Sequence, residues 1–236
     1  MSKRREFNDG VIVKFFNYVW WFLLGNFYFW ILNIPFIFVT LGLINYETVD
    51  VYMIIILMLS SIPIGPALTA LLSLMGKLTR EGDIDATKDF FKAYKINFLD
   101  SVLFWTLGIF ILTLAWVNIV YFNINSTLTL VGIIPRIIIF VCIALGFNIF
   151  PIMSRFYLKK KEILALSSMY LIKKIYVCII SIAVGYILWV ILIKIKLIVI
   201  LPLFFVSIIC YLIMFMEKSM LLDIEEKYNN KDVEVQ

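Results

Sequence analysis

Long apolar runs, separated by short polar stretches, dominate the pattern along this chain. Each run supplies close to the roughly 20 apolar residues that a helix needs to cross the hydrocarbon core of a bilayer. The pattern therefore predicts an all-α fold, a polytopic transmembrane helix bundle of six spans, in which residues 1–236 form a single membrane domain. The expected spans cover residues 18–43, 51–75, 99–122, 129–153, 175–193 and 197–216. The fourth span begins either near Thr129, with a kink at Pro135, or at Pro135 itself.

Two polar stretches, residues 76–98 and 154–174, are predicted to form amphipathic hairpins in the cytoplasm, and residues 217–236 a cytoplasmic tail. In the first stretch the helical spacing puts lysines mainly on one face and four aromatic residues on the other. These aromatic residues are Phe90, Phe91, Tyr94 and Phe98. Two interpretations are open: this face lies on the membrane or packs within the protein, or it docks on a cytoplasmic partner.

The orientation follows from the distribution of lysine and arginine. Under the six-span arrangement, 18 of the 21 basic residues fall before the first span, after the second and fourth spans, or in the tail. The other face holds Arg136, Lys194 and Lys196. Because basic residues are retained on the cytoplasmic side, both termini are expected in the cytoplasm. Five or seven spans would spoil this separation.

A proline-rich break and a single arginine are the features within the spans that suggest a function. Pro63, Gly65 and Pro66 interrupt the second span, where a kink or break is expected. Such a break lines a substrate path in some transporters, or it lets neighbouring helices pack closely. Arg136 lies near the outer end of the fourth span, where it marks a pathway or extends its side chain to the interface.

The composition excludes the soluble classes and offers no catalytic machinery. The chain is 63% hydrophobic and 16% charged, whereas soluble chains are nearer half apolar and a quarter charged. The net charge of +5 is interpreted as a topology signal rather than as a nucleic-acid footprint. Histidine is absent and each of the three cysteines lies in an apolar run, so no metal, cofactor or disulfide is expected. With no phosphate loop and no nucleophile elbow, the chain is not expected to be an enzyme.

Three motifs resemble the YesL-type family of bacterial integral membrane proteins. They are Gly65-Pro66-Ala67-Leu68-Thr69-Ala70-Leu71, Arg80-Glu81-Gly82-Asp83, and Asp89-Phe90-Phe91-Lys92-Ala93-Tyr94-Lys95-Ile96-Asn97-Phe98. Phe150-Pro151 and the following Arg155-Phe156-Tyr157-Leu158 are similar to the second cytoplasmic hairpin of that family. The chain departs from the family in reading Arg-Glu-Gly at 80–82, where Arg-Gly-Glu is usual, and in carrying Phe91 where tryptophan is common.

The resemblance implies a plasma-membrane protein from a family whose biochemistry is poorly defined. Because members tend to be encoded near carbohydrate uptake and degradation systems, it implies an accessory or permease-like component of carbohydrate uptake. The expected partners are the lipid bilayer and transporter subunits. One alternative is a membrane scaffold or sensor with no transport activity. Another is a stand-alone transporter or channel, whose polar path would have to use Arg136, the intramembrane asparagines and the proline break.

Overall fold

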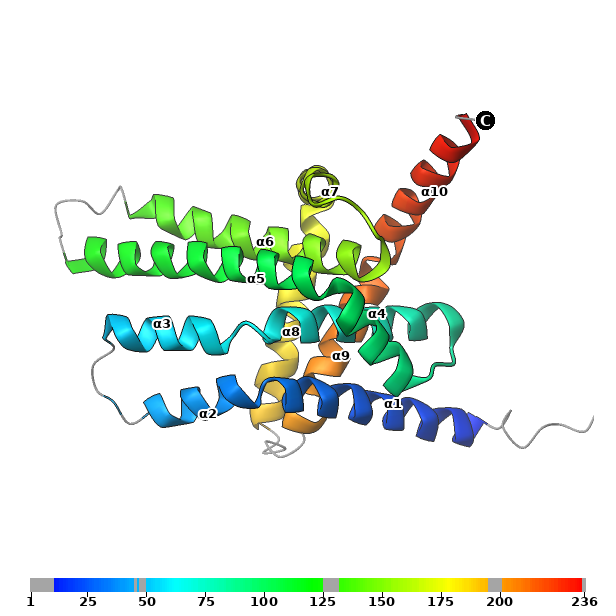
Figure 1. The fold of residues 1–236 in the computed structure, drawn as a ribbon, viewed down its shortest axis with the longest axis horizontal. Helices are drawn as coiled ribbons and strands as arrows, with labels where there is room; N and C mark the ends of the chain where they lie inside the picture. The colour runs from blue at the N-terminus through cyan, green and yellow to red at the C-terminus, as the bar shows by residue number, and fades with distance from the viewer. Residues whose placement is uncertain (1–10, 45, 47–49, 125–131, 195–200, 235–236) are drawn as a thin grey trace, which may run out of the picture.

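The computed structural model describes residues 11–44, 46, 50–124, 132–194 and 201–234, and these residues form helices and short connections without a strand. The all-α prediction is therefore confirmed for this part of the chain. The helices are α1 (Val11–Leu32), α2 (Ile34–Leu43), α3 (Val51–Ser60), α4 (Ile64–Glu81), α5 (Ala86–Ile124), α6 (Ile133–Arg155), α7 (Lys160–Lys173), α8 (Ile175–Lys194), α9 (Leu201–Met216) and α10 (Lys218–Glu234). Figure 1 shows their arrangement.

The first two predicted spans are each divided into two helices. The first begins seven residues before the predicted start of the run at residue 18, and α1 and α2 meet at Asn33 with a bend of 63°. Pro35 lies in the first turn of α2. Proline suits this position, because the backbone N–H that it lacks would have no partner within the helix there. It therefore favours a new helix beginning after Asn33. The second break lies at Ser61–Pro63, between α3 and α4. The helical region of this segment continues past residue 75 as far as Glu81.

The stretch at 76–98 is the end of one helix and the beginning of another rather than an element of its own. Helix α4 ends at Gly82, whose left-handed backbone (φ 72°) suits glycine. Helix α5 then runs for 39 residues through the predicted boundary at 98/99, because no proline or glycine interrupts it before Gly108. At 1.5 Å per residue it is about 58 Å long, roughly twice the hydrocarbon thickness.

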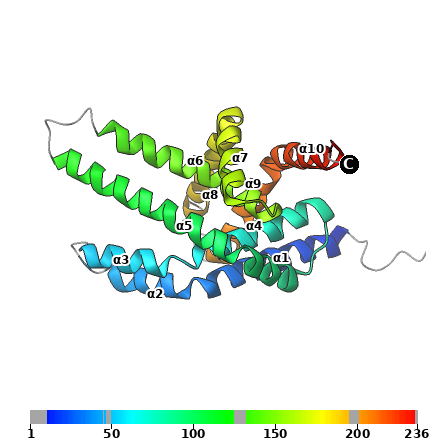
Figure 2. The same cartoon turned by 45° about the horizontal axis from the view of Figure 1, so that its top comes forward.

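Among the described residues, three helical segments are long and apolar enough to cross a membrane: Val51–Glu81, Ala86–Phe122 and Ile133–Arg155. The number rises to six if three bent pairs each count as one span, namely α1 with α2, α7 with α8, and α9 with α10. Figure 1 shows α8 and α9 running at a steep angle to α1, α4, α5 and α6 rather than alongside them, and Figure 2 shows the same helices from a second side. The simple bundle of six aligned spans thus stays a prediction.

Helix α6 begins at Ile133, between the two predicted starts of the fourth span, with Pro135 in its first turn. In the polar stretch 154–174 the helix is α7, and most of the tail forms α10. Parts of the connections that were expected on the outer face, namely residues 45, 47–49, 125–131 and 195–200, lie outside the described residues.

The core is concentrated around α4, which packs against α1, α5, α6 and α9. Eleven residues of α4 are buried, among them Leu71, Leu74 and Met75. This part of the molecule also holds the basic residues Lys77, Arg155 and their neighbours, and it is called the basic end below. At the opposite, far end, α2 and α3 contain no buried residue. The α2–α3 hairpin therefore contributes little to the core.

Large apolar side chains cover much of the outer surface. Phe38 on α2 is 79% exposed, Leu99 on α5 is 77% exposed, and Trp116 on α5 is 63% exposed. A water-soluble monomer rarely exposes apolar surface on this scale. A bilayer removes the free-energy cost of this exposure, because lipid tails are as apolar as these side chains. The surface is that of a membrane protein.

Candidate functional site: an apolar cavity beside the broken helix

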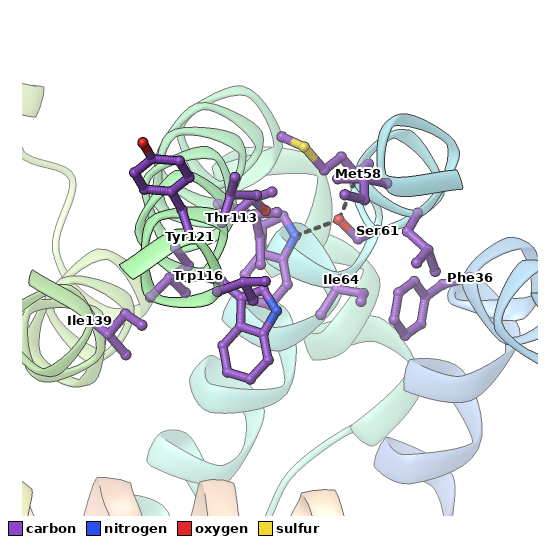
Figure 3. Close-up of a pocket in the computed structure, with 15 residues that line it drawn as sticks. Phe36, Met58, Ser61, Ile64, Thr113, Trp116, Tyr121 and Ile139 are labelled. Carbon is purple, nitrogen blue, oxygen red and sulfur yellow. Dashed lines mark hydrogen bonds between the residues drawn. The ribbon is translucent and has the colours of Figure 1, made fainter. Parts of the chain in front are cut away.

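A cavity of about 870 Å³ lies at the far end, between the α2–α3 hairpin and α5. Its volume falls in the range of ordinary ligand sites. Figure 3 shows the side chains that line it, which come from α2, α3, the connection between α3 and α4, the start of α4, α5 and α6. They are Phe36, Ile54, Leu57, Met58, Ser61, Ile64, Trp105, Ile109, Leu112, Thr113, Trp116, Val117, Val120, Tyr121 and Ile139. The lining is mainly aliphatic and aromatic, with no charged residue.

Two of the polar side chains at the wall of the cavity, Ser61 and Trp105, are bonded to each other. Trp105 donates a hydrogen bond from Nε1 to Ser61 Oγ, at 3.3 Å, and Ser61 Oγ donates to Met58 O, at 2.8 Å. Figure 3 shows both bonds. They fix the Trp105 indole against the break between α3 and α4. The cavity therefore presents mostly carbon surface, which suits an apolar occupant rather than a sugar or an ion.

The proline break brings two helices into close contact. A Cβ atom added at Gly65 would lie 2.5 Å from Trp105 Cβ and 2.8 Å from Ser101 O, so α4 and α5 touch there through backbone. One turn further along, Ser101 Oγ donates to Thr69 Oγ1, at 2.9 Å. Pro66 is buried and Pro63 is half-buried. These contacts favour the packing interpretation of Pro63, Gly65 and Pro66 over a substrate path.

Arg136 lies in the first turn of α6, away from the cavity. Its side chain is exposed, and Nη1 donates to Gly132 O, at 2.6 Å. The lining of the cavity includes Ile139 but not Arg136. This placement at the end of the helix favours an arginine that reaches the interface over one that lines a pathway.

The aromatic residues of the predicted docking face do not share one environment. Phe90 is fully buried and contacts Tyr28 of α1, with ring centroids 5.5 Å apart. Phe91 and Phe98 are exposed, and Tyr94 is half-buried. Phe91 also contacts Tyr28, with ring centroids 5.1 Å apart, and Tyr94 packs against the core. The helix thus packs on its own protein through Phe90, and the exposed parts of Phe91 and Phe98 are left for lipid or a partner.

The hydrogen bonds described for the intramembrane asparagines are all made with backbone atoms. Asn33, Asn118 and Asn148 each donate from Nδ2 to the carbonyl four residues earlier in their own helix, at 2.7–3.0 Å. Asn26 instead accepts from the backbone N–H of Ser207, at 3.3 Å, and joins α1 to α9. These contacts are structural ones. In the described part of the chain no three His, Cys, Asp or Glu side chains gather as metal ligands would.

Ion pairs connect separate helices at the basic end. Lys77 of α4 pairs with Asp89 of α5, and Lys160 of α7 pairs with Asp100 of α5, at 2.8 and 3.3 Å. The hydrogen bond to Asp89 raises the pKa of Lys77. Lys174, at the end of α7, lies 3.4 Å from Asp223 of α10. Arg155 of α6 pairs with Glu225 of α10. The amphipathic stretches and the tail are thereby held together.

A buried carboxyl group at the basic end was not predicted from the sequence. Glu217, where α9 bends by 53° into α10, is 1% exposed, and its Oε2 has no hydrogen-bond partner among the described residues. Burial raises the pKa of Glu217 to about 7, and the nearby Lys174 opposes this shift. In the sequence it is only the first acidic residue after a long apolar run, which does not reveal its burial.

The fold and the cavity define an all-helical protein whose apolar helices are long enough to cross a membrane. Residues 29–119, from the end of α1 through most of α5, match a family described as "Protein of unknown function, DUF624". This segment carries most of the cavity lining and the three motifs quoted above. No curated protein and no solved structure gives a significant match to the chain.

Proposed function

We propose that this protein is an accessory component of a plasma-membrane transport system, which holds an apolar transmembrane segment of a transporter subunit in the cavity at its far end. Both termini lie in the cytoplasm in this proposal, in accord with the positive-inside distribution. The observation that carries it is the apolar, aromatic-rich cavity beside a hairpin that buries no residue of its own.

The composition of the cavity supports a protein helix as its occupant. Trp105, Trp116 and Tyr121 line it, and aromatic residues of these types dominate the binding energy of many protein interfaces. The α2–α3 hairpin would bury its apolar side chains when a helix lies against it. Its length of ten residues per helix matches about half the hydrocarbon core, so the contact would lie in the outer leaflet.

A stand-alone transporter for polar solutes is less well supported. Such a protein needs polar groups directed at a shared path, whereas the asparagines described above bond mainly within their own helices. The Gly65 contact with α5 and the position of Arg136 argue in the same direction. A scaffold or sensor without any part in transport is the second candidate, because an apolar cavity serves it equally well.

The substrate class of the transport system rests on resemblance. The motifs at 65–71, 80–83 and 89–98 resemble the YesL-type family, whose members tend to be encoded near carbohydrate systems. Carbohydrate uptake is therefore the proposed process, with the protein assisting a permease rather than carrying the sugar itself.

Photo-crosslinking in native membranes tests the proposal with a matched pair of positions on α2. Phe36 lines the cavity, whereas Phe38 is exposed outside it. Each is replaced in turn by the photo-reactive p-benzoylphenylalanine. We expect the probe at Phe36 to give an adduct with a transporter subunit, identified by mass spectrometry, and the probe at Phe38 to give lipid adducts.

Two results would overturn parts of the proposal. If the probe at Phe36 gives no polypeptide adduct in cells that are importing oligosaccharides, the cavity does not hold a partner helix. If the crosslinked polypeptide belongs to no transport system, and a deletion strain imports every oligosaccharide at the normal rate, the scaffold alternative replaces the transport role.

A further inference from the structure

A second apolar groove, of about 440 Å³, lies between α5 and α6 and reaches the basic end. Its walls include Phe104 and Gly108 of α5, Cys142 and Gly146 of α6, and Leu164 of α7. Nearly all of its surface is carbon, and Lys160 of α7 is the one charged residue among its lining residues. The groove is therefore apolar along its length and basic at one end.

The length of the groove corresponds to one leaflet of a bilayer. On α5 the lining runs from Leu103 to Leu112, and on α6 from Cys142 to Pro151. Nine helical steps of 1.5 Å give about 14 Å, close to half of the hydrocarbon thickness of roughly 30 Å. Lys160 lies at the end of this stretch where the head groups of the cytoplasmic leaflet are expected.

Lys160, the basic residue that lines the end of the groove, stands between two further lysines in the sequence. Lys159, Lys160 and Lys161 are all exposed. Lys160 Nζ lies 3.3 Å from Asp100 Oδ1, and Glu162 Oε2 accepts from the backbone N–H of Lys159 at 3.1 Å. Two carboxylates thus face three lysines, which leaves the group with net positive charge. The Lys159 and Lys161 ammonium groups remain available for an anion, because no ion pair engages them within the described residues.

We propose that this groove binds an anionic phospholipid of the cytoplasmic leaflet, with an acyl chain between α5 and α6 and the phosphate against Lys159–Lys161. The apolar groove and the basic cluster complement the two parts of such a lipid. Basic pockets between transmembrane helices are known to recognise anionic head groups on this side of a membrane.

Two glycines provide the space for the acyl chain. A Cβ atom at Gly108 would meet nothing within 4 Å, and one at Gly146 would meet only Phe150 Cε2, at 4.0 Å. A leucine at position 146 would therefore project into the groove without first displacing a neighbouring atom. Gly42 on α2 also has nothing within 4 Å but lies outside the groove, so it offers a matched control.

The test measures lipid binding to the purified full-length protein by native mass spectrometry, using phosphatidylglycerol and phosphatidylcholine with identical acyl chains. We expect the wild type to retain phosphatidylglycerol at least several-fold better. The triple variant K159Q/K160Q/K161Q should lose most of this preference. The triple variant K88Q/K92Q/K95Q, which removes the same charge from exposed lysines of α5, should keep it.

The groove itself is tested by Gly146→Leu, which should lower retention of both lipids, while Gly42→Leu should leave it unchanged. Thermal unfolding confirms that each variant is folded. Equal retention of the two lipids by the wild type, or an unchanged preference in K159Q/K160Q/K161Q, would overturn the head-group site. Unchanged retention in a folded Gly146→Leu variant would overturn the acyl-chain site. Neither result depends on the Phe36 crosslink, which probes the other cavity.

Discussion

At the scale of single residues, Glu217 is the side chain whose protonation depends most directly on its burial in the protein. Its carboxyl lies at the bend between α9 and α10, directly after the predicted sixth span, and Lys174 is the charged group that acts on it. Burial opposes ionisation because the charged form loses its hydration. The pKa of Glu217 is raised from its ordinary 4.5 to about 7, so the folded protein binds a proton there that the unfolded chain has released.

This shift predicts a pH-dependent stability. Between pH 4.5 and 7 the folded state holds more protons, so the free energy of unfolding falls as the pH rises through this window. The contribution of the Glu217 proton to the free energy of unfolding is complete below pH 4.5 and is lost above pH 7. Glu217→Gln removes the titration, and it should be more stable than the wild type by about 1–3 kcal/mol at pH 8 but not at pH 4.5. Unfolding in detergent across this pH range measures the difference, and parallel profiles would contradict it.

Gly65 gives the second prediction at this scale. A methyl group there would clash with the Trp105 Cβ and the Ser101 carbonyl, neither of which moves without shifting α5. Gly65→Ala should therefore destabilise the protein by about 1–3 kcal/mol. Gly42→Ala, where the added atom meets nothing, should change stability little or raise it slightly. A similar loss in both variants, measured as the midpoint of thermal unfolding, would show that the contact between α4 and α5 is not the cause.

At the scale of elements, the turn between α4 and α5 is stabilised by one carboxylate. Asp89 Oδ2 accepts from Lys77 Nζ at 2.8 Å and from the backbone N–H of Asp85 at 3.1 Å. The first bond joins the two helices and the second fixes the start of α5. Both side chains of the ion pair are partly shielded from water, which strengthens it relative to a surface pair.

Asp89→Asn should lower the free energy of unfolding by about 1–2 kcal/mol, because the amide keeps the shape of the side chain but removes the negative charge that pairs with the Lys77 ammonium. Glu81→Gln is the matched control: Glu81 also faces Lys77, but at 3.8 Å and with half of its side chain exposed. Its removal should cost less than about 0.5 kcal/mol. If both variants lose the same stability, the total negative charge near Lys77 matters rather than the close contact that Asp89 makes.

The elements also show how far sequence reasoning reaches. The apolar runs indicated most helices, and Pro63 and Pro66 indicated the break between α3 and α4, because these signals act locally. The break at Asn33 was not predicted, since the first span was expected to be continuous. Periodicity grouped Phe90 with Phe91 and Phe98, but it could not tell that Phe90 is fully buried while Phe91 and Phe98 are exposed. The cavity, the buried Glu217 and the steep course of α8 and α9 depend on how distant segments meet, and no local pattern specifies this.

At the scale of the whole molecule, the basic end and the far end differ in how they are held together. Ion pairs and the buried residues of α4 connect the helices at the basic end. At the far end, apolar side chains face the cavity or the exterior. The orientation predicted from the basic residues, in which the basic end lies in the cytoplasm, stays a prediction.

Cysteine labelling in intact cells tests that orientation. The native cysteines are replaced by serine, and one cysteine is introduced at Asp83, in the turn after α4, or at Tyr46, between α2 and α3; both positions are exposed. In intact cells, a membrane-impermeant thiol reagent should label Tyr46→Cys but not Asp83→Cys. In permeabilised cells, the same reagent should label both variants. Labelling of Asp83→Cys in intact cells would reverse the topology.

The α2–α3 hairpin, which buries no side chain against the rest of the chain, has a final consequence. Because few contacts within the protein resist its displacement, the energy of moving it is set chiefly by the medium around it. The width of the opening beside Trp116 is then a property of the protein together with its bilayer. Detergent, thin membranes and thick membranes should each select a different spacing between this hairpin and α5.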